Sequence, residues 1–329
     1  MARIVRLTEI GDSSVLKLVD EPVQEPKEDE VRIRVQAIGL NRAEVLFRQG
    51  RYLEKPSFPA RIGYEASGII EAVGSAVTEF KSGDKVSTIP SFKMSKYGVY
   101  GESAVVPASS VAHYPDNLSP EEGASIWMQY LTAYGALVEY GNIGPGDYVL
   151  ITAASSSVGF AAIQICLDKG AIPIATTRGS AKKQTLLDAG AKHVIVTNDE
   201  KLVDKVKEIT SNKGCRIIFD AIAGNVVNEL AQAAAYEATI FEYGALSLEA
   251  TPFPLMIALE KGLSIRGYTL FQITSSPEAK ERGKNYVYDG LKSGKLKPVI
   301  DKVFPFDQIA QSQDYMESNQ QNGKIIVKV

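Results

Sequence analysis

The chain has 329 residues, of which 45% are hydrophobic and 23% charged, a composition typical of one large globular domain or two ordinary ones. A net charge of −3 without a basic block argues against nucleic-acid binding, and no run of about 18 apolar residues indicates a membrane-spanning helix. The two cysteines are too few for a disulfide framework and fit a reducing cytoplasm, while the two histidines leave little material for a metal site.

The first third of the chain predicts short β-strands. Residues 30–40 alternate, with Val31, Ile33 and Val35 on one side and arginine or glutamine on the other. Residues 67–77 and 83–90 form two further short runs, broken by glycine and proline. Short strands at this spacing predict a small barrel.

A helix is predicted to start near Pro120 and to end at Gly141, with Ser119 as N-cap and Glu122 in a capping box. Beyond it, strands and helices alternate. The predicted strands span residues 148–154, 171–177, 193–197, 215–221, 239–244 and 263–269, and the helices between them start near Ser157, Ser180, Lys201 and Asn225. This βαβ series predicts an α/β fold with a doubly wound parallel sheet.

The last segment of the chain mixes element types. Residues 275–294 and 306–323 predict helices, and residues 323–329 predict a closing strand. We expect this tail to return to the first domain, because the two ends of a chain often lie near each other.

The first strand of the βαβ series runs into a turn of small residues. A dinucleotide fingerprint, G-x-G-x-x-G, would place its glycines at Ala154, Ser156 and Gly159, and only the last is glycine. An ordinary βα turn is the alternative. The turn nevertheless follows an apolar strand, opens a helix and carries the hydroxyls of Ser155, Ser156 and Ser157. Because a helix N-terminus also favours an anion, we interpret the turn as a dinucleotide site.

The end of the second strand indicates which dinucleotide binds. NAD-specific domains place an acidic residue there, about 20 residues beyond the turn, to bind the ribose 2′-hydroxyl. Here no carboxylate occurs between Gly170 and Asp188. Arg178 stands in the place of the acid, with Lys182 and Lys183 just beyond. A guanidinium grips a 2′-phosphate and an ammonium adds charge, so the sequence predicts NADP(H); a solvated basic turn is the alternative.

The chain resembles the medium-chain dehydrogenase/reductase superfamily over nearly its whole length. The resemblance lies in the order of four segments along the chain, residues 67–86, 100–125, 153–171 and 322–329, the third of which is similar to the A-A-x-G-G-V-G turn of quinone reductases. It implies a GroES-like β-barrel domain, residues 1–122 and 270–329, that carries an inserted Rossmann dinucleotide-binding domain, residues 123–269.

Within the superfamily, the chain resembles the zinc-free quinone oxidoreductase branch, also called zeta-crystallin-like. Zinc enzymes have a Cys-His pair where residues 41–42 are Asn-Arg, and Gly-His-Glu where residues 63–65 are Gly-Tyr-Glu. Met128 lies near the place of their third ligand, and no cysteine occurs around residues 91–101, where their structural zinc lobe belongs. The resemblance therefore implies no metal ligand.

The branch implies an NADPH-dependent oxidoreductase that transfers a hydride to a quinone or to an α,β-unsaturated carbonyl. Without zinc as a Lewis acid an unactivated alcohol is hard to deprotonate, whereas a conjugated acceptor spreads the incoming charge. The expected catalytic residues are Asn41, Tyr52 and Tyr64, with the proton coming from water or from a hydroxyl such as that of Tyr52. The structural alternatives are that Asn41 caps a turn, that Tyr52 is a rim aromatic and that Tyr64 fills space.

The expected cofactor contacts combine the turn, the basic segment and positions matched to the family. Thr132 matches a family residue near the nicotinamide, with a helix-surface threonine as the alternative. The whole expected set is Asn41, Thr132, Ala154, Ser155, Ser156, Ser157, Val158, Gly159, Thr177, Arg178, Lys182, Tyr243, Gly244 and Lys324.

Other functions stay open at this point. The protein could bind NADPH without turnover, as a redox sensor or a structural protein, or be a zinc alcohol dehydrogenase, which the missing ligands disfavour. Quinone reduction and C=C reduction also remain alternatives. This branch commonly forms homodimers, and the strand at residues 263–269 is expected to pair with its copy at the sheet edge.

Overall fold

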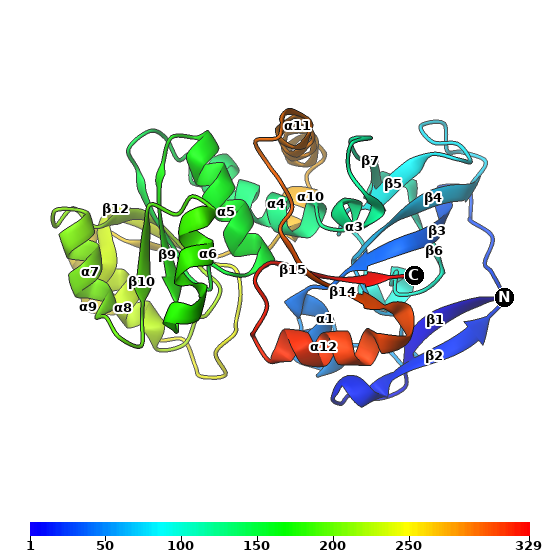
Figure 1. The fold of residues 1–329 in the computed structure, drawn as a ribbon, viewed down its shortest axis with the longest axis horizontal. Coiled ribbons are helices and arrows are strands. Elements are labelled where there is room, and N and C mark those ends of the chain that lie inside the picture. Colours follow the sequence, from blue (N-terminus) through cyan, green and yellow to red (C-terminus); the bar gives the residue numbers. More distant parts are fainter. The chain divides into compact units, whose positions relative to one another are not determined.

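The computed structural model describes residues 1–329, and the chain divides into two compact units (Figure 1). The first unit comprises Met1–Met128 and Pro298–Val329, and the second comprises Gln129–Lys297. The second unit is therefore one continuous stretch inserted into the first. None of the helices has the length and the apolar character that crossing a membrane requires.

The first unit consists mainly of β-strands. They are β1 (Ala2–Leu7), β2 (Leu16–Glu21), β3 (Glu30–Gly39), β4 (Glu65–Val73), β5 (Lys85–Thr88), β6 (Ser103–Pro107), β7 (Val111–His113), β14 (Ile300–Pro305) and β15 (Lys324–Lys328). The helices are α1 (Arg42–Arg48), α2 (Met94–Tyr97), α3 (Pro120–Gly123) and α12 (Ile309–Glu317), with single turns η1 (Ser13–Val15), η2 (Ala108–Ser110) and η5 (Phe306–Gln308).

One sheet organises these strands. It has seven strands in the order β14-β15-β3-β4-β5-β7, with β6 also paired to β3, and β1 and β2 form a separate pair. In Figure 1 the C-terminal strand β15, coloured red, joins β3, coloured blue, so strands from the first third and from the C-terminal end of the chain share one sheet. β3 shifts register twice against β4, and such bulges bend a strand and increase its twist.

The second unit is an α/β layer structure. Its strands are β8 (Tyr148–Ile151), β9 (Ile172–Thr177), β10 (His193–Val196), β11 (Cys215–Asp220), β12 (Ala234–Glu242) and β13 (Ser264–Gly267). Its helices are α4 (Trp127–Tyr134, starting in the first unit), η3 (Gly135–Tyr140, a π-helix), α5 (Ser157–Asp168), η4 (Ser180–Lys182), α6 (Lys183–Asp188), α7 (Leu202–Ile209), α8 (Val226–Ala233), α9 (Leu255–Lys261), α10 (Phe271–Thr274) and α11 (Pro277–Ser293).

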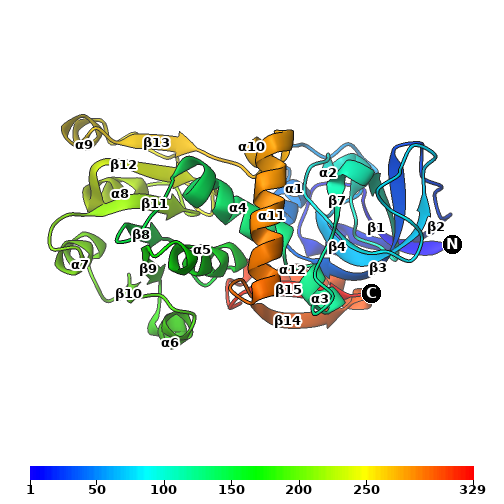
Figure 2. The ribbon, with the colours of Figure 1, turned by 90° about the horizontal axis from the view of Figure 1, so that it is seen from above.

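The strand order of the second sheet is β10-β9-β8-β11-β12-β13, and every pair is parallel. The chain thus enters this sheet at the central strand β8, proceeds through β9 to the edge strand β10, and then returns to β11 and proceeds to the other edge at β13. This order confirms the predicted doubly wound sheet. Figure 2 shows α7, α8 and α9 along one face of this sheet and α5 and α6 along the other. Because helices cover both faces, the strands are apolar on both sides, with Leu150, Ile174 and Ile218 fully buried.

The predicted single helix from Pro120 to Gly141 is broken in the structure. It consists of α3, α4 and the π-helix η3. The break before α4 coincides with a long-range contact: the backbone N–H of Met128 donates to Glu65 Oε1 at 2.9 Å. The carboxylate of Glu65, the first residue of β4, thus accepts an N–H group that a continuous helix would bond to a carbonyl of its preceding turn.

Helix α11 lies in the second unit, although the sequence placed residues 270–329 with the first domain. Two contacts with α5 hold the segment there: Tyr286 donates to Asp168 at 2.9 Å, and Lys295 pairs with the same carboxylate at 2.9 Å. Gly283 also lies so close to α4 that a Cβ would meet Leu131 at 2.8 Å. The structure thus divides into compact units after residues 128 and 297. The domain limits given by the family resemblance, 1–122 with 270–329 and 123–269, remain a prediction.

Candidate functional site

The turn between β8 and α5 has the geometry of an anion site. Ser156 is the N-cap of α5, and its hydroxyl accepts the backbone N–H of Gly159 at 3.1 Å. A Cβ at Gly159 would lie 2.3 Å from the carbonyl oxygen of Ala154, so only glycine lets helix and strand approach this closely. Helix α5 has 12 residues, and the free N–H groups of its first turn, with Ser157 and Val158 among them, favour a negative charge.

The basic segment after β9 reaches this turn. Thr177 ends β9, and Arg178 follows it as an exposed side chain. Lys182 Nζ lies 3.3 Å from the hydroxyl of Ser155, so its ammonium links the basic segment to the serine turn between β8 and α5. The structure therefore brings two separately predicted sets of residues together, and no carboxylate occurs in the chain between Gly170 and Asp188.

Polar side chains line the carboxyl ends of β8, β11 and β12, where the strand order reverses. Asp220 accepts hydrogen bonds from Thr152 Oγ1 at 2.5 Å and from the backbone N–H of Ala223 at 2.7 Å. Glu242 is its direct neighbour in the β11–β12 register. Burial, and then the charge of Asp220, raises the pKa of Glu242 to about 9, so this carboxyl group is neutral at pH 7.

Three further predicted contacts lie in the second unit. Tyr243 stacks on Phe219 with ring centroids 4.0 Å apart, and its buried hydroxyl has no hydrogen-bond partner. Gly244 packs against β11, where a Cβ would meet the carbonyl oxygen of Ala221 at 2.7 Å. Thr132 lies on α4 and is buried, so it is not the helix-surface threonine of the alternative interpretation.

The first unit contains a buried polar cluster, which we define as Asn41, Glu44, Glu65 and Lys324. The Lys324 ammonium is fully buried and donates to Glu65 Oε2 at 2.5 Å and to Asn41 Oδ1 at 2.6 Å. Asn41 Nδ2 donates to the carbonyl of Gly39 and to Glu44 Oε1, each at 3.2 Å. Both amide hydrogens of Asn41 and two ammonium hydrogens of Lys324 are thus used inside the protein.

Glu44 completes the buried polar cluster at the start of α1. Its carboxylate accepts the backbone N–H of Asn41 at 2.6 Å and that of Tyr64 at 3.1 Å. Burial raises the pKa of Glu44 to about 7, although Lys324 and these hydrogen bonds oppose the rise. From the sequence, Glu44 is expected to be a structural carboxylate rather than a general acid, and the N-x-x-E spacing of Asn41 and Glu44 is the local signal of such a helix start.

Tyr52 and Tyr64, both predicted from the resemblance, lie against each other. Their ring centroids are 6.3 Å apart in an edge-to-face arrangement. Tyr64 is connected to the buried polar cluster, since its backbone N–H donates to Glu44. Burial raises the pKa of Tyr52 to about 12 and that of Tyr64 further still, so both remain phenols at neutral pH.

The positions matched to zinc ligands carry an amide, a phenol and a thioether, from Asn41, Tyr64 and Met128. Zinc prefers thiolate, imidazole and carboxylate ligands. No group of three or more His, Cys, Asp or Glu side chains is arranged to hold a metal ion, and both cysteines are buried. The absence of bound zinc stays a prediction.

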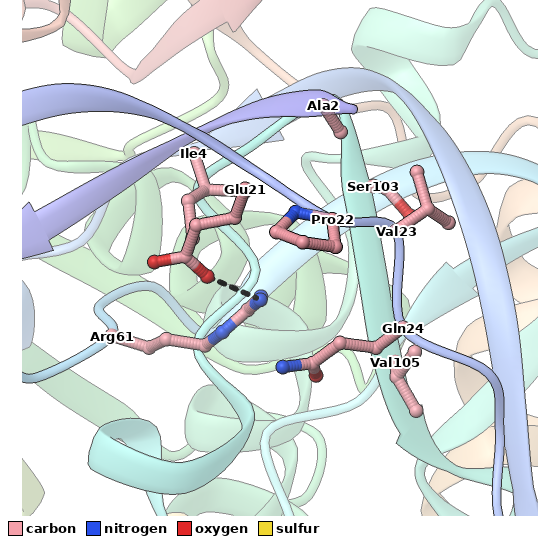
Figure 3. A pocket seen from close by; sticks show the side chains of 9 residues that line it. All are labelled: Ala2, Ile4, Glu21, Pro22, Val23, Gln24, Arg61, Ser103 and Val105. Atoms are coloured by element: carbon pink, nitrogen blue, oxygen red, sulfur yellow. Dashed lines mark ion pairs between the residues drawn. The ribbon is translucent and has the colours of Figure 1, made fainter.

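A small cavity lies elsewhere in the first unit, between β1, β2 and β6. Figure 3 shows Arg61 pointing toward Glu21, which pairs with it at 3.8 Å and with Arg6 at 2.7 Å. The cavity volume of about 10 Å³ suits one water molecule. None of its lining residues belongs to the candidate site, so we assign it a structural role.

Each of the two units contains a segment that matches a dehydrogenase family model. The family model described as alcohol dehydrogenase GroES-like domain matches residues 27–116, and the one described as zinc-binding dehydrogenase matches residues 157–285. The first match confirms the predicted GroES-like domain.

Individual relatives span nearly the whole chain. Human quinone oxidoreductase is 32% identical over 333 residues, covering 99% of this chain and 98% of its own length. The structure of Escherichia coli quinone oxidoreductase complexed with NADPH has a TM-score of 0.92 at 27% identity and covers 100% of both chains. A structure described as an NAD-dependent alcohol dehydrogenase has a TM-score of 0.92 at 30% identity and covers 99% of both.

The raised pKa of Glu44 predicts a pH dependence of stability. Its pKa is about 7 in the folded protein and near the ordinary value of 4.5 when unfolded, so the folded protein holds the extra proton between these values. The contribution is complete below about pH 4.5 and is lost as the pH rises through about 7. Urea unfolding at pH 5, 6.5 and 8 should therefore show a steeper loss of stability in wild type than in Glu44→Gln. Parallel pH dependences would contradict this assignment.

Proposed function

The chain belongs to the quinone oxidoreductase branch of the medium-chain dehydrogenase/reductase superfamily, and from this premise we propose that it transfers a hydride from NADPH to a quinone or an α,β-unsaturated carbonyl without a metal ion. The observation that carries the proposal is the Tyr52–Tyr64 pair, because Tyr64, at the position matched to a zinc-ligand histidine, packs edge-to-face against Tyr52. Such a site offers a proton rather than a Lewis acid.

We propose NADP(H) as the cofactor because the second unit combines an anion site with positive charge. The N-terminus of α5 and the serine turn suit the pyrophosphate, and Gly159 permits the close approach. Arg178 and Lys182 suit a 2′-phosphate, since no carboxylate stands at the end of β9. The proposed contacts are Ala154, Ser155, Ser156, Ser157, Val158, Gly159, Thr177, Arg178, Lys182, Thr132, Tyr243 and Gly244.

The bound cofactor supplies the hydride, and the protein supplies position and a proton. A conjugated acceptor spreads the incoming negative charge over its oxygen, so it requires no metal ion. We propose that Tyr52 donates the proton and that Tyr64 holds Tyr52 in place. Asn41 and Lys324 act from the buried polar cluster: their mutual hydrogen bond at 2.6 Å leaves only the second lone pair of Asn41 Oδ1 and one Lys324 hydrogen for a ligand.

We also propose that the protein is a homodimer that pairs through the edge strand β13. Ser264–Gly267 bonds to β12 on one side only, so its other backbone edge is free to pair with a copy. Nearby, α9 exposes Leu255, Met256 and Leu259 at 53%, 75% and 68%, an apolar surface that a dimer would cover. Two buried free cysteines fit a reducing, cytoplasmic setting, which we propose for this protein.

The substrate class can be tested by following NADPH absorbance with a panel of 1,4-quinones, enones and simple alcohols. We expect turnover with the conjugated acceptors, no gain from added zinc and no loss to chelators. Elemental analysis of the same sample should find no stoichiometric zinc. Binding of NADPH without turnover of any acceptor would favour the sensor alternative, and faster oxidation of ethanol than reduction of any acceptor would favour the alcohol dehydrogenase.

The cofactor preference can be tested at Arg178. Arg178→Ala should weaken NADPH binding by about 1–3 kcal/mol, the size of a lost charge-assisted hydrogen bond, and leave NADH binding nearly unchanged. Lys183→Ala is the matched control, because Lys183 is an exposed cation five residues further along. Fluorescence titrations of both cofactors measure the effect, and an equal loss for NADH and NADPH would remove the basis for the assignment.

The dimer can be tested on α9. Met256→Glu combined with Leu259→Glu should convert a dimer into a monomer in analytical ultracentrifugation, because charges would lie in the apolar interface. Val303→Glu is the control, since Val303 is also an exposed apolar residue, at 45%, but lies in the first unit. A wild type that sediments as a monomer, or a double variant that stays dimeric, speaks against this interface.

A further inference from the structure

We infer that Thr152 and Asp220 are positioning residues, whose buried hydroxyl–carboxylate bridge holds the turns after β8 and β11 in the form that binds the pyrophosphate of a dinucleotide. This role deepens the proposed function and rests on it for the class of ligand. Neither residue is among the cofactor contacts proposed above. Both residues lie in the second unit, and so do the two turns.

The bridge lies where β8 and β11 stop pairing. The ladder between the two strands ends at Thr152, whose backbone N–H donates to the carbonyl of Phe219 at 3.1 Å. Beyond it, side chains connect the two chains: Thr152 Oγ1 donates to Asp220 Oδ1 at 2.5 Å and accepts the backbone N–H of Ala221 at 2.9 Å. Thr152 is 1% exposed and Asp220 0%. Water is therefore excluded from this bridge, and the hydroxyl joins the two chains at the point where they separate.

The separation of these two chains is the place where a sheet of this kind binds its ligand. The chain after β8 enters α5, the chain after β11 enters α8, and Figure 2 shows these helices on opposite faces of the sheet. Ligands bind outside the carboxyl ends of the strands at this point of the strand order. Thr152 also directly precedes the turn, residues 153–156, to which we assign the pyrophosphate. The bridge therefore lies at the base of the proposed site.

Asp220 also orients the turn after β11. Its Oδ2 accepts the backbone N–H of Ala223 at 2.7 Å, and its Oδ1 accepts that of Ile222 at 3.1 Å. With the Thr152 hydroxyl, three donors surround one carboxylate, and an ionised carboxylate is an acceptor on both oxygens. An asparagine could accept with only one of its two terminal atoms. The charge of Asp220 is thus used within the protein, to fix the backbone around it.

The backbone of both turns requires such support. Ala153 has φ of +45° and Ala223 has φ of +59°, in the left-handed region that alanine rarely adopts. Ala153 directly follows Thr152, and its carbonyl accepts the N–H of Ser156, the N-cap of α5, at 2.9 Å. Ala223 is held by its bond to Asp220. Strained residues persist only where their surroundings hold them, so loss of the bridge should let both turns relax.

Two buried threonines allow a matched comparison. Thr152→Val removes the hydroxyl and keeps the shape of the side chain. Thr210→Val does the same to a threonine that is also 1% exposed and also accepts a backbone N–H, from Gly214 at 2.9 Å, but that lies before the amino end of β11. Isothermal titration calorimetry should show affinity for NADPH and for NADH falling about tenfold each in Thr152→Val, because the turns hold the binding form for a smaller fraction of the time. Both affinities should change by less than about twofold in Thr210→Val.

Conservative variants separate the bridge from packing. Thr152→Ser keeps the hydroxyl and should bind both cofactors within about twofold of wild type. Asp220→Asn keeps the shape but accepts with one atom only, so it should lose affinity for both cofactors, as Thr152→Val does. Equal losses in the two valine variants, a loss in Thr152→Ser as large as in Thr152→Val, or an unchanged affinity in Asp220→Asn would overturn the inference.

A ligand without a pyrophosphate completes the test. Adenosine 2′-monophosphate retains the group assigned to the basic segment after β9, so its affinity should be the same in wild type and in Thr152→Val. A tenfold loss for this ligand as well would mean that the whole sheet is disturbed, and would overturn the positioning role. The expected pattern of cofactor affinities in a protein that reduces no acceptor supports the positioning role and rejects the proposed hydride transfer alone.

Discussion

The buried ion pair between Lys324 and Glu65 is the contact on which the first unit depends. It joins the closing strand β15 to the start of β4, and Asn41 attaches the end of β3 to the same ammonium. Taking two charges out of water is unfavourable unless each finds its partner, so loss of either residue leaves an uncompensated charge in the interior. The pair therefore specifies one arrangement of three strand ends that lie far apart in the sequence.

The rest of the candidate site follows from this arrangement. Asn41 is oriented by Lys324, Glu44 is held by Asn41, and Tyr64 is held by Glu44. Tyr52 is the last member, and it lies on residues 51–59, which form no helix or strand. Each hydrogen bond orients the next group as far as Tyr64, whose ring packs against Tyr52, so the position of a half-buried phenol derives from a charge pair in the core. Gly39 belongs to the same packing, because a Cβ there would meet Ala124 O at 1.9 Å.

The sequence predicted what local periodicity and strand ends determine. The doubly wound sheet followed from alternating strands and helices, and the tight turn before α5 from the small residues before Gly159. It did not predict contacts between distant segments. Lys324 was assigned to the cofactor by resemblance, yet it is fully buried against Glu65, 259 residues away in the chain. The helix from Pro120 was predicted to be continuous because no local sequence pattern indicates that Glu65 accepts the backbone N–H of Met128.

The closing strand also imposes an order on biosynthesis. Residues 129–297 form a complete unit and leave the ribosome while β14 and β15 are still unmade. Until residues 324–328 emerge, β3 has an open hydrogen-bonding edge and Glu65 has no cation beside it. During this stage of synthesis the second unit is complete, whereas the first unit still lacks β14 and β15. Chaperone protection of the first unit therefore matters most at this stage.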